Sequence, residues 1–120
     1  MYVSRLSFCT IPGKGPKVAA ELEKLVEFIA KDTGARPRVL RTHFASSGEA
    51  DFQLEQEVGS LNDLEHQLHK VTDDDEFRRW SEGFSQLLCR SPKREVFEII
   101  QLAVSLGRPA RPGRAAAGSG

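Results

Sequence analysis

Hydrophobic and polar positions follow two different periods along the chain. Alternation with a period of two predicts β-strands over residues 2–11, 38–44 and 51–58. The high content of Val, Ile and Phe predicts a last strand over residues 94–102. Hydrophobic residues that recur at steps of three and four predict amphipathic helices over residues 16–33, 60–71 and 73–90. The last two helices form one helical region in two parts, so the predicted order of elements is βαββαβ.

Local signals mark where these helices begin and end. Pro16 suits the first turn of a helix, where no backbone N–H is needed, and Gly34 readily adopts the left-handed conformation that ends one. Ser60 can accept a backbone N–H from the first turn of the next helix, as in a capping box. Thr72 or Asp73 is expected to cap the helix that follows.

This order of elements predicts an α+β fold of the ferredoxin-like type, with a four-stranded antiparallel sheet and the helices on one face. A hairpin is expected to join residues 38–44 to residues 51–58. The face under the helices is expected to carry Leu6, Phe8, Leu40, Phe44, Phe52, Leu54 and Val58.

The opposite face of the sheet is predicted to mix polar and apolar side chains. Its expected members are Val3, Arg5, Ser7, Cys9, Val39, Arg41, His43, Gln53, Glu55 and Glu57. Such a face could be solvated, with cross-strand ion pairs, or could close on a second copy of the chain. A small open sheet gains from the second arrangement because it hides the face and the edge strands.

Composition bounds the class of protein. The chain of 120 residues is predicted to hold one domain, residues 1–106, and a flexible tail at 107–120 that is rich in Gly, Ala, Pro and Arg. Its 17 basic and 17 acidic residues leave no net charge, which argues against nucleic acid and membrane surfaces as partners. No spanning segment and no secretory signal is recognised, so a cytoplasmic location is expected.

His43 is the first candidate for chemistry. An imidazole beside Arg41, across a hairpin from Glu55, could act as a general base near neutral pH. Arg5 and Gln53, on neighbouring strands, could line a polar pocket that orients a carboxylate, phenolate or enolate. The alternative for this group is cross-strand pairing inside a dimer interface.

Other residues carry weaker signals. Trp80 and Phe84 lie at helical spacing and are interpreted as core residues or as one wall of a ligand pocket. Cys9 and Cys89 are expected to be reduced, and the topology brings them to the same end of the sheet, where the thiols can approach each other. No spacing typical of a metal site or a nucleotide loop occurs, so neither a metal nor a cofactor is expected.

Several short sequence segments resemble those of the dimeric α+β barrel superfamily. The first strand runs into Pro-Gly-Lys-Gly at 12–15, the split helical region carries Asp-Asp-Glu-Phe-Arg-Arg-Trp at 74–80, and the last strand begins Arg-Glu-Val-Phe-Glu-Ile-Ile at 94–100. Over residues 1–102 the chain is most similar to NIPSNAP-like and stress-responsive A/B-barrel proteins, and more distantly to antibiotic-biosynthesis monooxygenases. The resemblance implies a homodimer whose two sheets face each other, with a small-molecule pocket between sheet and helices or inside the barrel.

The leading hypothesis is a homodimeric α+β barrel that binds a small aromatic or polyketide-like molecule. If it is also an enzyme, it works without a cofactor, through acid/base groups positioned around the ligand. The residues assigned to chemistry are His43, Arg41 and Glu55, and those assigned to binding are Arg5, Gln53, Trp80 and Phe84. Two alternatives stay open: a non-enzymatic dimeric assembly or regulatory module, and a cofactor-free monooxygenase, which rests on the resemblance.

Overall fold

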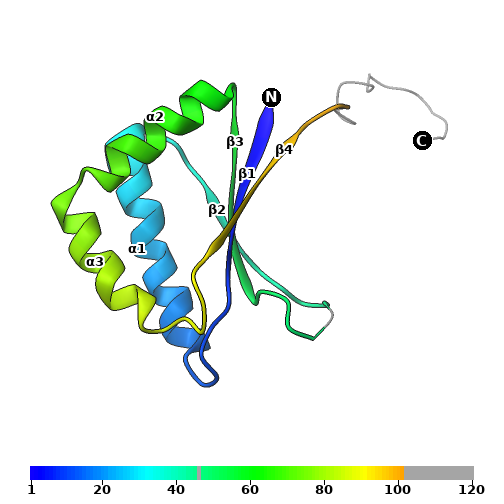
Figure 1. The fold of residues 1–120 in the computed structure, drawn as a ribbon, viewed down its shortest axis with the longest axis vertical. Helices are drawn as coiled ribbons and strands as arrows, with labels where there is room; N and C mark the ends of the chain where they lie inside the picture. The colour runs from blue at the N-terminus through cyan, green and yellow to red at the C-terminus, as the bar shows by residue number, and fades with distance from the viewer. Residues whose placement is uncertain (46, 102–120) are drawn as a thin grey trace, which may run out of the picture.

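The computed structural model describes residues 1–45 and 47–101. Its elements are β1 (Tyr2–Phe8), α1 (Gly15–Thr33), β2 (Arg38–Arg41), β3 (Phe52–Val58), α2 (Leu61–Thr72), α3 (Asp75–Ser85) and β4 (Lys93–Glu98). The strands form one antiparallel sheet in the order β2-β3-β1-β4. The helices lie against one face of this sheet, and no described element covers the other (Figure 1). The predicted order of elements and the ferredoxin-like α+β class are confirmed.

Helix α1 begins and ends at the predicted signals, and α2 begins at its predicted cap. Pro16 stands in the first turn of α1, and Gly34 ends that helix with a positive φ of 76°, donating its N–H to the carbonyl of Ala30 at 2.8 Å. Ser60 Oγ accepts the backbone N–H of Asp63 at 3.0 Å and so caps α2. These local interactions set the helix ends.

The cap of α3 is a correction to the prediction. Asp74 caps this helix, in place of Thr72 or Asp73, because its carboxylate accepts the backbone N–H groups of Glu76 at 2.9 Å and Phe77 at 3.3 Å. Asp73 instead ends α2. A carboxylate at this position also interacts favourably with the positive end of the helix dipole.

Several elements are shorter than the sequence predicts. The segment after α3 pairs with the continuation of β1: Ile11 donates its N–H to the carbonyl of Leu87 at 2.9 Å, and Leu88 forms an isolated bridge with Thr10. This pairing stops the helix at Ser85, where the sequence pattern extended it to residue 90. The last strand is Lys93–Glu98, which begins one residue before the predicted range 94–102 and ends earlier.

The hydrophobic core lies between the sheet and the helices. Phe8 is 1% exposed, and its ring meets the ring of Phe84 edge to face at 5.7 Å. The other buried members of the core are Val18, Leu22, Leu25, Ile29, Phe52, Leu54, Val71 and Leu88. The core therefore joins every helix to the two central strands, β1 and β3.

The faces of β2 are reversed relative to the prediction. Val39 pairs with Leu54, whereas Leu40 pairs with Gln53, and directly paired residues lie on the same face of a sheet. Val39 therefore packs on the core, and Leu40 lies on the uncovered face. Phe44, also expected in the core, lies beyond the end of β2 and is 90% exposed. Adjacent apolar residues fit either phase of a period-two pattern, so the pattern alone could not choose.

No helix in the described ranges is long and apolar enough to cross a membrane. The tail predicted at 107–120 lies outside the described residues.

Candidate functional site

The uncovered face of the sheet carries a cluster of paired charges. Glu55 in β3 is buried because Arg5 and Arg38 lie on either side of it and both bind its carboxylate. Arg5 Nε donates to Glu55 Oε2 at 2.8 Å, and Arg38 donates to Oε1. The hydrogen bond from Arg38, together with that from Arg5, holds the pKa of Glu55 below its ordinary value, against the effect of burial. Glu55 is thus an ionised carboxylate that is already satisfied.

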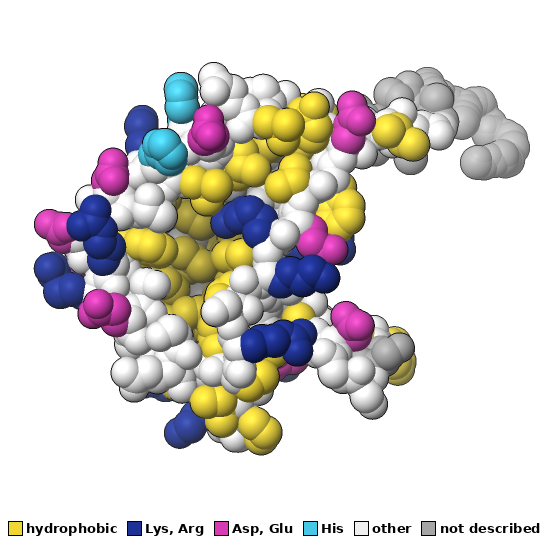
Figure 2. Space-filling view, viewed as in Figure 1, with side chains coloured by type: hydrophobic (Ala, Val, Ile, Leu, Met, Phe, Trp, Pro, Cys, Tyr) yellow, Lys and Arg dark blue, Asp and Glu magenta, His cyan; other side chains and the backbone are white. Residues whose placement is uncertain are grey.

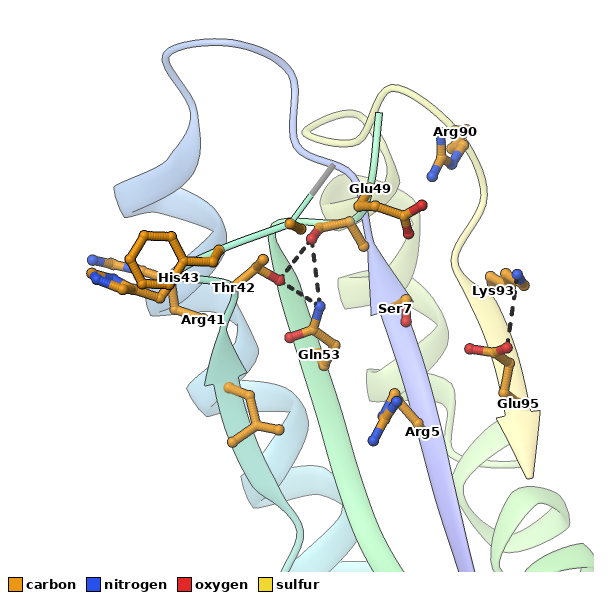
Figure 3. Close-up of a pocket in the computed structure, with 14 residues that line it drawn as sticks. Arg5, Ser7, Arg41, Thr42, His43, Glu49, Gln53, Arg90, Lys93 and Glu95 are labelled. Carbon is orange, nitrogen blue, oxygen red and sulfur yellow. Dashed lines mark hydrogen bonds and ion pairs between the residues drawn. The ribbon is translucent and has the colours of Figure 1, made fainter. Parts of the chain in front are cut away.

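His43 and Arg41 do not join Glu55. Both lie toward the outer edge of β2 (Figure 3), where the exposed imidazole packs on the ring of Phe44 with centroids 4.6 Å apart. Arg41 pairs with Phe52, which puts it in the helix-facing register, and its guanidinium carbon lies 5.6 Å from the centroid of that ring. The register of Arg41 is therefore opposite to the predicted one, although Arg41 and His43 both border a hollow beside Gln53. Glu55 does not line that hollow, so the three residues assigned to chemistry are not all brought together.

A hollow of about 540 Å³ lies beside Gln53 on the uncovered face (Figure 3). Gln53 Nε2 donates to Thr42 Oγ1 at 2.7 Å, and Thr42 donates to the carbonyl of Ala50 at 2.7 Å. These bonds fix the start of the loop between β2 and β3 against the sheet. The border of the hollow is mostly polar and includes Arg5, Ser7, His43, Arg90, Lys93 and Glu95.

A second pocket, which we call the helix-side pocket, lies between the sheet and the helices and measures about 170 Å³. The rings of Trp80 and Phe84 stack in its wall, with centroids 4.7 Å apart and planes at 13°. Trp80 Nε1 donates to Glu21 Oε1 at 2.8 Å, which fixes the orientation of the indole. Figure 2 shows the hollow between helices and β4, lined by hydrophobic side chains with basic ones at its edge. Among its apolar members are Leu6, Phe8, Leu25, Leu54, Leu68 and Phe77.

Arg94 lies at the border of the helix-side pocket. It pairs with Leu6 across β1 and β4, so its side chain belongs to the helix-facing register. Arg94 Nη1 donates to the buried hydroxyl of Ser4, while the side chain stays open to solvent through the pocket. Desolvation by the surrounding protein lowers the pKa of the Arg94 guanidinium, which remains a cation at neutral pH.

Gln56 is the second polar side chain of interest in this pocket. Its Nε2 donates to Gln67 Oε1 at 2.7 Å, whereas its Oε1 is buried and has no hydrogen-bond partner among the described residues. Buried acceptors are usually paired, so this oxygen is an unsatisfied acceptor within the fold.

Sequence analysis missed Arg94 and Gln56 as site residues. Lys93, Arg94 and Glu95 are all charged, so the alternation within β4 does not tell which of them faces the helices. The register decides it, because Arg94 stands opposite Leu6 in β1. No local signal could have found it, because Val96 and Phe97 are adjacent apolar residues that fit either phase of the strand.

Cys9 and Cys89 lie side by side, as expected from the topology. The backbone N–H of Cys89 donates to the Cys9 carbonyl at 2.9 Å, and Cys89 Sγ lies 3.4 Å from the same oxygen. Both thiols are free. Burial raises the pKa of Cys9, which keeps this thiol protonated. Within the described part of the chain, no group of His, Cys, Asp or Glu is arranged to hold a metal ion.

Comparison with protein-family models and with curated proteins finds no match. Solved structures do match. A NIPSNAP domain protein from Burkholderia xenovorans superposes with a TM-score of 0.69 at 12% identity, over 86% of this chain and 96% of that one. A NIPSNAP family protein from Agrobacterium tumefaciens gives 0.69 at 14% identity, over 82% and 86%. An antibiotic-biosynthesis-monooxygenase-like protein from Nitrosomonas europaea gives 0.63 at 13% identity, over 84% and 100%. The predicted resemblance is confirmed as one of fold: this chain has the α+β fold of NIPSNAP and antibiotic-biosynthesis-monooxygenase-like proteins.

Proposed function

We propose that this protein is a small-molecule-binding domain whose ligand enters the helix-side pocket. The observation that carries the proposal is the stacked pair of Trp80 and Phe84 in the wall of a largely apolar pocket. Small-molecule sites are typically concave and apolar with a few placed polar groups, and burying apolar ligand surface contributes roughly 25 cal/mol per Å². Relatives in fold that include monooxygenase-like proteins support a small-molecule role.

Binding accounts for this pocket better than acid/base catalysis does. The polar residues that line it are Gln56, Gln67, Thr72, Ser81 and Arg94. Among the described lining residues none offers a carboxylate, an imidazole or a thiol, the groups that most often move protons in enzymes. An arginine and neutral polar groups can orient a ligand, and orientation is what a binding site requires.

We also propose that a second copy of the chain covers the open face of the sheet. The apolar side chains Val3, Leu40 and Phe97 lie there among three basic residues, Arg5, Arg38 and Lys93, and three acidic residues, Glu55, Glu57 and Glu95. In a twofold dimer the same patch meets itself. A patch whose charges balance can do so without net repulsion, and pairing would bury its apolar members.

The test of the binding proposal uses Trp80, the only tryptophan in the chain, as a reporter inside the pocket. The full chain is titrated with benzyl alcohol and with cyclohexanol, neutral probes that do not emit with tryptophan. We expect a saturable change in Trp80 fluorescence and a higher Tm, because a ligand that binds only the folded state stabilises it.

A matched pair of variants locates the response. Ser81→Leu fills the pocket from α3 and is expected to abolish the saturable change. Ser85→Leu makes the same substitution one turn later, at an exposed position outside the pocket, and should leave the change intact. A flat titration of the unaltered chain with both probes, or a response that survives Ser81→Leu, would contradict the proposal.

A further inference from the structure

The helix-side pocket has one cationic group at its border, and that group lacks an acidic partner. Among the described residues no carboxylate forms an ion pair with Arg94, whereas Arg5 and Arg38 both bind Glu55. Other arginines in the described part of the chain are also unpaired, but Arg94 is the one that borders the helix-side pocket among its described lining residues. Its hydrogen-bond partner is the neutral hydroxyl of Ser4. A guanidinium carries five N–H donors in a planar fork, so most of the donors of Arg94 remain free for a ligand.

Arg94 is partly desolvated by the pocket border although the residue remains exposed. The surrounding protein disfavours its charged form, and no nearby anion compensates. An arginine on an edge strand can extend fully into water, yet the hydrogen bond to buried Ser4 holds this one over the helix-facing side of β1. A bound anion would supply the compensation that the described chain does not.

Gln56 is a second polar residue of the pocket, near Arg94 and Ser4 on the sheet. Its buried Oε1 has no partner among the described residues. Gln56 stands opposite Ser4 in the pairing of β1 with β3, so the unpaired amide oxygen and the residue that holds Arg94 are neighbours on the sheet. Only a donor can satisfy Gln56 Oε1, and an ionised carboxylate has none. The anionic end of a ligand is therefore assigned to Arg94 alone, while the rest of the pocket offers apolar contacts.

The size of the pocket limits the apolar part of the ligand. Its volume is about 170 Å³, and a protein cavity of roughly 150 Å³ lined by Leu, Ile and Phe accommodates benzene. This space matches the size of a single aromatic ring. The stacked rings of Trp80 and Phe84 favour a flat ring, because aromatic pairs gain from stacked and edge-on contacts beyond burial alone.

We propose that the helix-side pocket binds a monocyclic aromatic carboxylate, with its ring against Trp80 and Phe84 and its carboxylate on the guanidinium of Arg94. This inference rests on the proposed binding function and names the ligand class. Arginine and carboxylate form charge-assisted, often bidentate hydrogen bonds. The site should therefore prefer an aromatic acid over a neutral analogue of the same shape, and over a small anion without a ring.

The experiment compares benzoate, its neutral isostere benzamide and acetate as probes of the full chain, by Trp80 fluorescence and calorimetry at neutral pH. We expect benzoate to bind about tenfold or more tightly than benzamide, and acetate to give no saturable response. Arg94→Gln should reduce benzoate affinity to that of benzamide. Lys93→Gln, the same charge change on the opposite face of β4, should keep the preference.

Each result separates this inference from the proposed function. Suppose that benzoate and benzamide bind the unaltered chain equally and that Ser81→Leu abolishes both. This result would overturn the role of Arg94 and leave the pocket as the ligand site. A preference that persists in Arg94→Gln would also overturn it. No response to any aromatic probe would overturn both proposals. If Arg94→Gln fails to fold, the benzoate-to-benzamide ratio of the unaltered chain decides alone.

Discussion

The charged side chains on the two faces of the sheet differ in whether they have a charged partner. On the uncovered face, Glu55 lies between Arg5 and Arg38, and each of these charges has a partner within the chain. On the helix side, Arg94 borders an apolar pocket and binds only a neutral hydroxyl among the described residues. The difference indicates that the charges of the uncovered face complete the structure, whereas the charge under the helices is available to a ligand.

The largest expected effect contrasts adjacent residues of β1. Phe8 is buried under the helices, whereas Ser7 lies on the uncovered face. Phe8→Ala should lower the free energy of unfolding by about 3–5 kcal/mol, since it removes a ring and leaves a cavity. Ser7→Ala should change it by less than about 0.5 kcal/mol. Urea unfolding of both variants measures the contrast, and equal losses would mean that the core does not lie on one side of the sheet.

The next effect concerns the buried carboxylate. Glu55→Gln keeps the shape of the side chain but removes the charge that Arg5 and Arg38 bind, and should lower the free energy of unfolding by about 1–3 kcal/mol at neutral pH. Glu57→Gln, on the same face but exposed, is the matched control and should have little effect. A neutral result for Glu55→Gln would show that the ion pairs do not stabilise the fold.

Glu55 also predicts a pH dependence. Its pKa is lowered in the folded protein by the two arginines, so its stabilising contribution is complete above the ordinary glutamate pKa of about 4.3. The contribution is lost as the pH falls through the lower pKa of the folded state. Below about pH 4, the unaltered chain should therefore lose its advantage over Glu55→Gln. Denaturant unfolding across this range measures the difference, and parallel pH profiles would contradict it.

A smaller effect tests the proposed dimer. Leu40→Asp adds a charge to the uncovered face and should weaken self-association by at least about tenfold, because a carboxylate would be buried in both halves of a twofold interface. Leu61→Asp, at an exposed leucine on α2, should leave self-association unchanged. Light scattering over a range of concentrations gives the mass. A monomeric unaltered chain at every concentration would remove the dimer, and the pocket proposal would still stand.

The smallest effect is expected at His43. It borders the hollow on the uncovered face and does not line the helix-side pocket. His43→Ala should therefore leave the Trp80 response to benzoate unchanged. A loss of binding on this substitution would move the ligand site to the other face and restore the role that the sequence suggests for the imidazole.

The sequence predicts the fold well because local signals and periodicity act together. Ser60 and Gly34 mark helix ends by their own chemistry, and β3 alternates cleanly, so Phe52 and Leu54 are assigned to the correct face. The same method fails in β2, where Val39 and Leu40 are both apolar and only pairing with β3 sets the phase. Pattern carries no information about register between distant strands.

The candidate site is predicted less well for the same reason. Trp80 and Phe84 are found because their spacing on one helix is local. Arg5 and Glu55 are correctly placed on one face, but as partners of each other. Arg94 is missed because its interest lies in its position beside an apolar pocket without a carboxylate partner among the described residues. This position follows only from the packing of β4 against β1 and the helices.

The most direct test of the account is the position of a bound aromatic acid. Crystals of the full chain soaked with 4-bromobenzoate allow the bromine to be located by its anomalous scattering. The account predicts a peak inside the helix-side pocket near Trp80 and Phe84, with the carboxylate on Arg94. A peak in the hollow beside His43, with the helix-side pocket empty, would contradict it.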